Sequence, residues 1–150
     1  MNDGLYLLDT SVLLALIRGD ATGKAVDQRF QLRSSKTRSF VSIVTHGEIH
    51  VLARRNEWGK QKLSTLKNAL DNLVTIDIHH QKVLDAYVEI DLHSLRHPDG
   101  ARNMGKNDLW IAACAKAAGL TLLTTDKDFA WLSPDLLRLE VIETAPPSES

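Results

Sequence analysis

The sequence is poor in cysteine and contains no long apolar stretch. Cys114 is the only cysteine among 150 residues, which excludes a disulfide framework and the paired-cysteine spacings of zinc fingers. No apolar run approaches the ~18 residues that a membrane-spanning helix needs. Asp3 and Asp9 interrupt any candidate signal peptide, which should be basic and then apolar. We therefore expect no membrane association and a location in the reducing cytoplasm.

The chain also has no large excess of positive or negative charge. The chain has 18 Lys and Arg against 19 Asp and Glu, for a net charge of −1. This balance by itself indicates neither a polyanionic nor a polycationic partner, so the distribution of charge matters more. One basic group (Arg96, Arg102 and Lys106) lies in the long polar segment 96–107. A phosphate backbone could be held there.

What the chain does have is a regular alternation of short apolar runs and longer helical stretches. The length fits one domain, which we expect over 1–143, followed by a flexible Pro- and Ser-rich tail at 144–150. The alternation predicts an α/β fold, a three-layer α/β/α sandwich with a central parallel sheet. The strands are expected at 5–8, 39–42, 73–76, 120–125 and 139–142. Helices are expected from residue 11, at 22–33, 42–55, 60–72 and 80–95, and from Asn107 to Gly119.

Acidic residues fall where such a fold builds its ligand sites, outside the carboxyl ends of the strands. Asp9 directly follows the first strand, Asp126 and Asp128 follow the strand at 120–125, and Asp108 opens a helix. Glu48 lies inside the helix 42–55. At about 100° per residue it shares a face with Val44, Val51 and Leu52, so we expect it to point inward.

Each acid taken alone has an ordinary structural explanation. Asp9 and Asp108 are typical helix caps, and "TTDKDF" (124–129) is common turn chemistry. Glu48 is harder to explain, because a buried, unpaired carboxylate is costly. If the acids converge, two unit charges 4 Å apart repel by roughly 4 kcal/mol at an effective dielectric near 20. A divalent cation would relieve this repulsion, and an all-oxygen site favours Mg²⁺ or Mn²⁺ over zinc.

Three motifs in this order and spacing resemble those of PIN-domain nucleases, and within that family the VapC-type toxins of toxin–antitoxin pairs. The motifs are "LLDTSVLLAL" near the start, "SIVTHGEI" with Glu48, and "MGKNDLWIAACAKAAGLTLLTTDKDF" near the end. The resemblance covers roughly residues 5–142. It implies a metal-dependent endoribonuclease that hydrolyses RNA phosphodiester bonds, a cognate antitoxin protein and, often, a homodimer.

Carried over by position, the acidic quartet of the family falls on Asp9, Glu48, Asp108 and Asp126. These are the expected catalytic residues and metal ligands, with Asp128 as a weaker candidate ligand. Ser11, or Thr10 beside it, matches the hydroxyl that follows the first Asp, and Thr124 and Thr125 match the hydroxyl-bearing end of the last strand. Among these we expect Ser11 and Thr125, with Asn107, to orient ligands or water, and we expect Arg102 and Lys106 to contact RNA. His46 and Gly47 depart from the apolar or small residues usual before the Glu, but they leave the quartet intact.

Other interpretations stay open at this stage. The protein could be a PIN-fold nuclease of RNA processing, or a non-catalytic RNA-binding or assembly module. "LLDTSVL" also resembles phosphatases with an Asp nucleophile, but Ser11 stands where their second Asp belongs. The pairs His46/His50 and His93/His97 have a zinc-like spacing, yet both should face outward. Asp91 falls on the apolar face expected from Leu84, Val88 and Leu95, and Trp58 and Trp131 are either interface anchors or ordinary packing.

Overall fold

Five strands alternate with six α-helices in the computed structural model, which describes residues 4–34, 36–97 and 104–144. The strands are β1 (Leu5–Leu8), β2 (Arg38–Ser42), β3 (Val74–Ile76), β4 (Thr121–Thr124) and β5 (Arg138–Val141). The helices are α1 (Thr10–Arg18), α2 (Ala21–Phe30), α3 (Ile43–Arg55), α4 (Lys60–Asp71), α5 (Gln81–Ser94) and α6 (Lys106–Ala118). A 3-10 helix, η2 (Lys127–Leu132), was not predicted.

The strands form one parallel sheet in the order β3-β2-β1-β4-β5. Successive strands run outward from β1 in both directions: β1 pairs with β2 through Leu7 and Phe40, and with β4 through Leu7 and Leu122. The gap between the carboxyl ends of β1 and β4 is therefore the point where the strand order reverses, and such points hold ligands in open α/β sheets.

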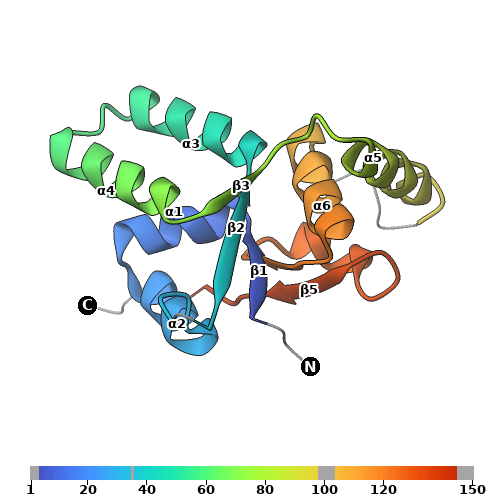
Figure 1. Ribbon diagram of the computed structural model, residues 1–150, viewed down its shortest axis with the longest axis horizontal. Coiled ribbons are helices and arrows are strands. Elements are labelled where there is room, and N and C mark those ends of the chain that lie inside the picture. Colours follow the sequence, from blue (N-terminus) through green and yellow to red (C-terminus); the bar gives the residue numbers. More distant parts are fainter. Residues whose placement is uncertain (1–3, 35, 98–103, 145–150) are drawn as a thin grey trace.

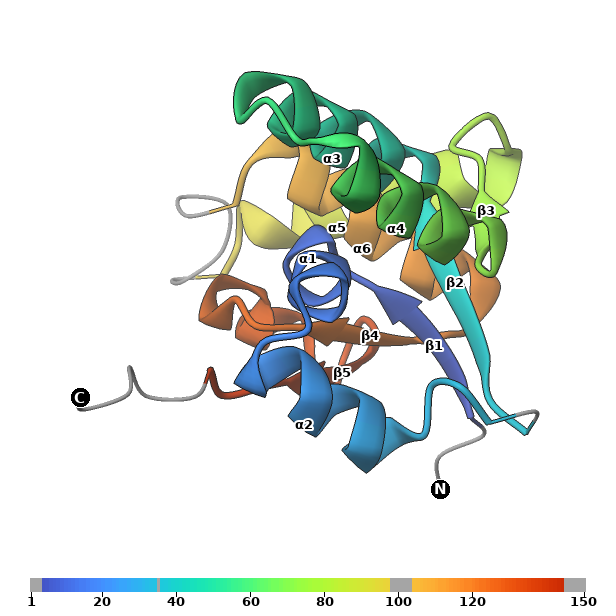
Figure 2. The same cartoon turned by 90° about the vertical axis from the view of Figure 1, so that its left-hand side faces the viewer.

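Helices cover both faces of the sheet, which confirms the predicted three-layer arrangement. In Figure 1, α5 and α6 lie on one side of the strands and α1 and α2 on the other. The view in Figure 2 places α1, α2 and the α3–α4 hairpin in front of the sheet, with α5 and α6 behind it. None of the described helices is long and apolar enough to cross a lipid bilayer.

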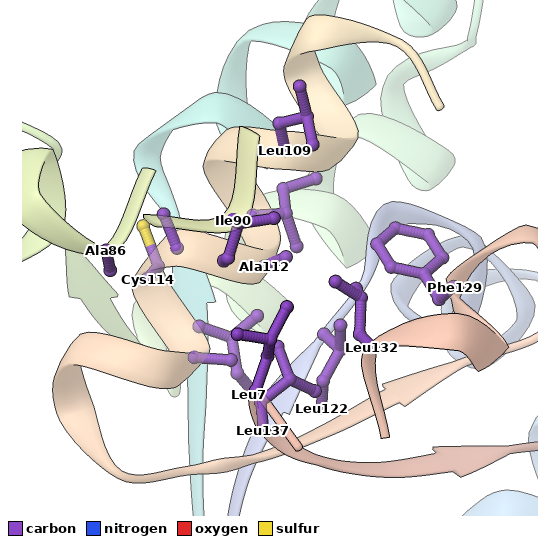
Figure 3. Packing of buried hydrophobic residues seen from close by; sticks show 14 of the residues in the cluster. Leu7, Ala86, Ile90, Leu109, Ala112, Cys114, Leu122, Phe129, Leu132 and Leu137 are labelled. Carbon is purple, nitrogen blue, oxygen red and sulfur yellow. The ribbon is translucent and has the colours of Figure 1, made fainter. Parts of the chain in front are cut away.

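Alternating side chains of the central strands supply both halves of the core. Leu7 and Leu122 point toward α5, α6 and η2, where they meet Ile90, Ala112 and Phe129 (Figure 3). Their neighbours Leu8 and Leu123 point to the opposite face, against α1 and α2. Strands buried on both faces read as continuous apolar runs, which is why "LYLL" and "LTLLTT" were recognisable in the sequence.

The predicted inward face of α5 is wrong. Leu84, Val88 and Leu95 are exposed, at 41%, 54% and 73%, and the buried residues are Val83, Ala86, Ile90 and Ser94. Apolar residues occur on nearly every side of this helix, so periodicity alone could not choose the side that packs on α6. Consequently Asp91 is half-buried at the edge of the packed face rather than at its centre.

The buried face of α3 also differs from the predicted one. Val51 is 59% exposed, and the buried residues of this helix are Thr45, Ile49 and Ala53. Glu48 is half-buried at the border of this face. Its inward direction was therefore predicted correctly, although Val51 was not one of its companions.

Gly23 marks a close approach of α1 and α2. A Cβ atom at this position would lie 2.2 Å from the carbonyl oxygen of Ala15. Because backbone cannot yield as a flexible side chain does, Gly23→Ala should lower the free energy of unfolding by about 2–3 kcal/mol. Urea denaturation measures this loss. Gly47→Ala is the matched control, since a Cβ there meets nothing within 4 Å, and equal effects at both positions would contradict the prediction.

The predicted domain and tail are placed only in part. The domain expected over 1–143 corresponds to elements from β1 to β5. Of the tail expected at 144–150, residues 145–150 lie outside the described residues. The helix expected at 22–33 ends at Phe30, because Gln31 adopts a left-handed backbone with φ of 51°.

Candidate active site

Two carboxylates of the site, those of Asp9 and Asp126, lie at the point where the strand order reverses. Asp9 follows β1 directly and caps α1, while Asp126 follows β4 and caps η2. The backbone amide of Asp9 donates to the carbonyl of Leu123, 2.9 Å away, which ties the two strand ends together. Parallel pairing thus brings residues 117 positions apart in the chain to one edge of the sheet.

Asp9 is only 5% exposed and is held by three donors. The Thr124 hydroxyl donates to Oδ2 at 2.7 Å, the Ser11 hydroxyl to the same oxygen at 3.0 Å, and the Thr10 amide to Oδ1 at 2.8 Å. Burial raises the pKa of Asp9, these donors oppose the rise, and the charge of Glu48 adds to it. The side chain is therefore a buried carboxylate held by three donors, in addition to capping α1.

Glu48 reaches the same place from α3. Its Oε1 accepts a hydrogen bond of 2.7 Å from the Thr10 hydroxyl, which lies 2.9 Å from the hydroxyl of Thr45. Since a hydroxyl has one proton to donate, Thr45 donates to Thr10 and Thr10 to Glu48. This chain of hydroxyls links the third helix to the residue next to Asp9.

Asp108 stands in the first turn of α6, behind an N-cap at Gly105. Asp108 is therefore not the N-cap residue of this helix. Its pKa is raised from 3.8 to about 6, most of all by burial and then by the charges of Asp9, Glu48 and Asp126, while a backbone hydrogen bond from Gly105 opposes the rise. The other three acids of the quartet therefore lie close enough to Asp108 for their charges to act on it.

Asp126 and Asp128 differ in their surroundings. Asp126 is half-buried, and its amide donates to the Thr124 hydroxyl at 3.0 Å. Asp128 is exposed, and its amide donates to Oδ1 of Asp126 at 2.9 Å. Asp128 does not contribute to the raised pKa of Asp108. Asp126 is accordingly the stronger candidate ligand of the two.

The donor set fits a hard divalent cation. Four carboxylates from β1, α3, α6 and β4 supply only oxygen, the ligand that Mg²⁺ and Mn²⁺ prefer, and their mutual repulsion is what a cation neutralises. Among residues 4–34, 36–97 and 104–144, no three His, Cys, Asp or Glu side chains form a ready-made cage for an ion. The charges of the other three acids act on Asp108, while the carboxylates of Asp9 and Glu48 accept hydrogen bonds from threonine hydroxyls.

The remaining predicted residues are only partly gathered here. Ser11 contacts Asp9, and its oxygen also accepts from the Thr125 amide at 3.3 Å. Thr125 therefore takes part in the site through its backbone amide, while the hydroxyl that donates to Asp9 belongs to Thr124. Asn107 and Lys106 are exposed at the start of α6, beside Asp108. Arg102 lies outside the described residues.

Three threonine hydroxyls support the carboxylates of the site, where the sequence favoured Ser11 and Thr125 among the hydroxyl-bearing residues. Thr124 is fully buried between Asp9 and Asp126, and Thr45 is fully buried three residues before Glu48. The Thr10 hydroxyl, next to Asp9 in the chain, contacts both Thr45 and Glu48. One signal was available: Thr45 and Glu48 lie one helical turn apart, which places them on the same side of α3.

Thr124→Val should weaken the site without changing its shape. Valine keeps the volume but leaves Asp9 Oδ2 with one donor fewer and removes the acceptor of the Asp126 amide. Loss of such a supporting hydroxyl lowers metal affinity by about 10- to 100-fold. Titration of Mn²⁺ by calorimetry measures the change. Thr121→Val, on the same strand, is the control and should bind Mn²⁺ like wild type; equal affinities for all three proteins would contradict the assignment.

Neither histidine pair forms a zinc site in the described part of the chain. His46 is half-buried, with Nε2 2.9 Å from the Thr75 hydroxyl, and His50 is exposed, with Nδ1 2.6 Å from the His46 carbonyl. The prediction that His93 and His97 face outward is wrong: both are half-buried against Trp131. This follows from the rotated face of α5.

Known proteins resemble this chain over most of its length. The PIN domain family model matches residues 6–133. Ribonuclease VapC5 from Mycobacterium tuberculosis is 29% identical over 129 residues, covering 84% of this chain and 86% of that protein. The structure of VapBC-5 from the same organism, a toxin–antitoxin system, has a TM-score of 0.63 at 25% identity, covering 92% of this chain and 97% of that one. VapBC2 from Rickettsia felis, bound to a promoter DNA fragment, has a TM-score of 0.75 at 24% identity, covering 92% and 98%.

Proposed function

The chain belongs to the PIN-domain family, and we propose that it is a Mg²⁺- or Mn²⁺-dependent endoribonuclease that acts as the toxin of a toxin–antitoxin pair. The observation that carries this proposal is that Asp9, Glu48 and Asp126, at one edge of the sheet, lie close enough to Asp108 for their charges to raise its pKa. The relative named ribonuclease VapC5 supports the substrate class, and the VapBC complexes support the toxin role.

The four acids would hold the cation, and their neighbours would keep them in position. When bound, a divalent ion supplies charge neutralisation at the scissile phosphate and a lower pKa for water. Thr124 and Ser11 hold Asp9 in position through Oδ2, and Thr10 holds Glu48 through Oε1. Lys106, exposed at the N-terminus of α6, is placed to contact a phosphate of the RNA backbone.

Cleavage of RNA in the presence of Mg²⁺ or Mn²⁺, and its loss in EDTA, tests the nuclease directly. RNA binding without cleavage in either metal would indicate a non-catalytic module instead. Growth arrest on expression, rescued by a small protein encoded next to this gene, would distinguish the toxin from a nuclease of RNA processing. Cleavage without growth arrest would contradict the toxin role alone.

A groove on the α1 side of the sheet offers a place for the antitoxin. Its volume is about 690 Å³, and its walls come from α1, α4 and the segment between α2 and β2. Leu16, Ile17 and Leu32 provide apolar surface, while Arg38 and the ion pair of Arg33 with Asp27 stand at its polar side. This chemistry suits an antitoxin segment that carries both apolar and acidic side chains.

The exposed stripe of α5 is suited to a second copy of the chain. Leu84, Val88 and Leu92 are 41%, 54% and 51% exposed and lie one turn apart along the helix. A single helix that presents a continuous apolar stripe is self-complementary about a two-fold axis, the commonest symmetry of homodimers. The groove proposed for the antitoxin lies across the sheet, so both partners fit at once.

The double variant Val88→Lys, Leu92→Lys should therefore convert a dimer into a monomer. Two buried, unpaired charges on each side of the interface cost more than the lost apolar contact alone. Size-exclusion chromatography with light scattering would measure half the mass. Val51→Lys, at an equally exposed valine of α3, should leave the mass unchanged. A double variant that stays dimeric would exclude α5 as the interface.

A further inference from the structure

We propose that an aromatic cluster formed by His93, His97 and Trp131 binds an unpaired base of the RNA beside the carboxylate site. The ring of Trp131 lies 6.0 Å from that of His93, with the planes only 6° apart, and 5.5 Å from that of His97. The two imidazoles are 6.3 Å from each other. The inference rests on the proposed nuclease function and adds a base-binding subsite to it.

The cluster is fixed in place from three elements. His93 lies in the last turn of α5, His97 follows that helix, and Trp131 belongs to η2. The indole N–H of Trp131 donates to the sulfur of Met104, 3.1 Å away, just before α6 begins. A ring held in this way loses little further freedom when a base stacks on it, which favours binding.

Two of the four acids lie on the segments that build this cluster. Asp126 caps the 3-10 helix that carries Trp131, and at ~2 Å per residue Trp131 is about 10 Å further along that helix. Met104, the partner of Trp131, lies just before α6 begins and four residues before Asp108. An RNA strand with a phosphate at the carboxylates therefore has a neighbouring base within reach of the rings.

The exposure of the rings favours a base over a purely structural role. All three side chains are half-buried, whereas the core beneath them, including Phe129 and Leu132, is fully buried. A centroid distance of 6.0 Å between nearly parallel rings is typical of offset stacking, in which each ring covers only part of the face of the other. Flat, partly open rings beside a phosphate site are how proteins hold single-stranded RNA.

Single-stranded RNA with one base removed at a time tests the cluster. The wild-type protein is first used to find a short RNA that it cuts at one position. Binding of that RNA is then measured by fluorescence anisotropy with Mg²⁺ in the Asp9→Asn background, where the strand should stay intact. The strands carry a single abasic site at each position around the cut, and the protein is compared with its Trp131→Leu and Trp131→Phe variants.

We expect Trp131→Leu to weaken binding of the intact RNA about 10-fold, since stacking on an aromatic ring is worth that much per base. One abasic position should weaken binding to a similar extent, and it should have no further effect in Trp131→Leu. Trp131→Phe, which keeps a ring, should bind nearly as the parent does. Trp58→Leu, at a half-buried tryptophan after α3, should show no such coupling.

The outcomes separate this inference from the function on which it rests. If the wild-type protein cuts no RNA, the nuclease proposal fails and the base subsite fails with it. If it cuts RNA but Trp131→Leu behaves like Trp58→Leu, only the base subsite is overturned. Loss of antitoxin binding with unchanged RNA binding would also overturn it, in favour of a protein contact. Should Trp131→Leu not fold, as judged by circular dichroism, His93→Leu and His97→Leu are tested by the same coupling.

Discussion

Asp108→Asn is expected to abolish RNA cleavage and, at the same time, to make the metal-free protein more stable at neutral pH. The substitution removes the carboxylate whose pKa is raised by burial and by the charges of Asp9, Glu48 and Asp126, and with it one proposed ligand of the cation. Loss of a group that supports charge at the reacting phosphate lowers the rate by about 100-fold or more. Removing the repulsion should raise the free energy of unfolding by about 1 kcal/mol, after solvent screening of a half-buried group.

Cleavage rates in Mg²⁺ and urea denaturation in EDTA measure the two effects on the same preparation. Asp71→Asn is the matched control, because this carboxylate is exposed at the end of α4 and pairs only weakly with Lys67, 3.9 Å away. It should retain both the activity and the stability of wild type. Asp9→Asn should lose cleavage as Asp108→Asn does. Full activity of either variant would remove Asp9 or Asp108 from the site.

The stability of the metal-free protein should fall as the pH rises from about 4 to above 6. Asp108 has a pKa of about 6 in the folded protein, against 3.8 in the unfolded chain. The folded state therefore binds the proton more tightly, so this contribution is fully favourable below pH 3.8 and is lost as the pH rises through about 6. The raised pKa of Asp9 acts in the same direction.

Thermal denaturation in EDTA between pH 4.5 and 7.5 measures this slope. Other groups also titrate in this range, so the informative quantity is the difference between wild type and Asp108→Asn, which should grow with pH. Mg²⁺ or Mn²⁺ at pH 7.5 should raise the melting temperature of wild type, because an ion that binds only the folded state stabilises it. The variant should respond much less. Parallel pH profiles would show that Asp108 does not repel its neighbours.

Much of the fold was predictable because its signals are local. The runs "LYLL" and "LTLLTT" gave two central strands within one residue of their observed bounds, and a parallel sheet follows from their alternation with helices. The acids were found in a similar way, since Asp9 and Asp126 directly follow strands whose carboxyl ends must share an edge. Glu48 was found from its position on a helix.

Other features depend on contacts between distant residues and had no local signal. The buried face of α5 is set by α6, and a helix with apolar residues on most sides does not reveal which side that is. The hydroxyl on Asp9 is that of Thr124 rather than Thr125, a choice that the pleat of β4 and its pairing with β1 make. The 3-10 helix after Asp126 forms around Phe129, which packs in the core.

Taken by itself, the sequence determined the layers of the sandwich, the parallel sheet and the four acids at its edge. Each of these follows from the order of apolar and polar residues along short stretches of chain. Only the tertiary structure decided which hydroxyls hold Asp9 and Glu48, and that His93 and His97 meet Trp131. Such pairings depend on how helices rotate and strands align when they pack, and that is a property of the assembled core.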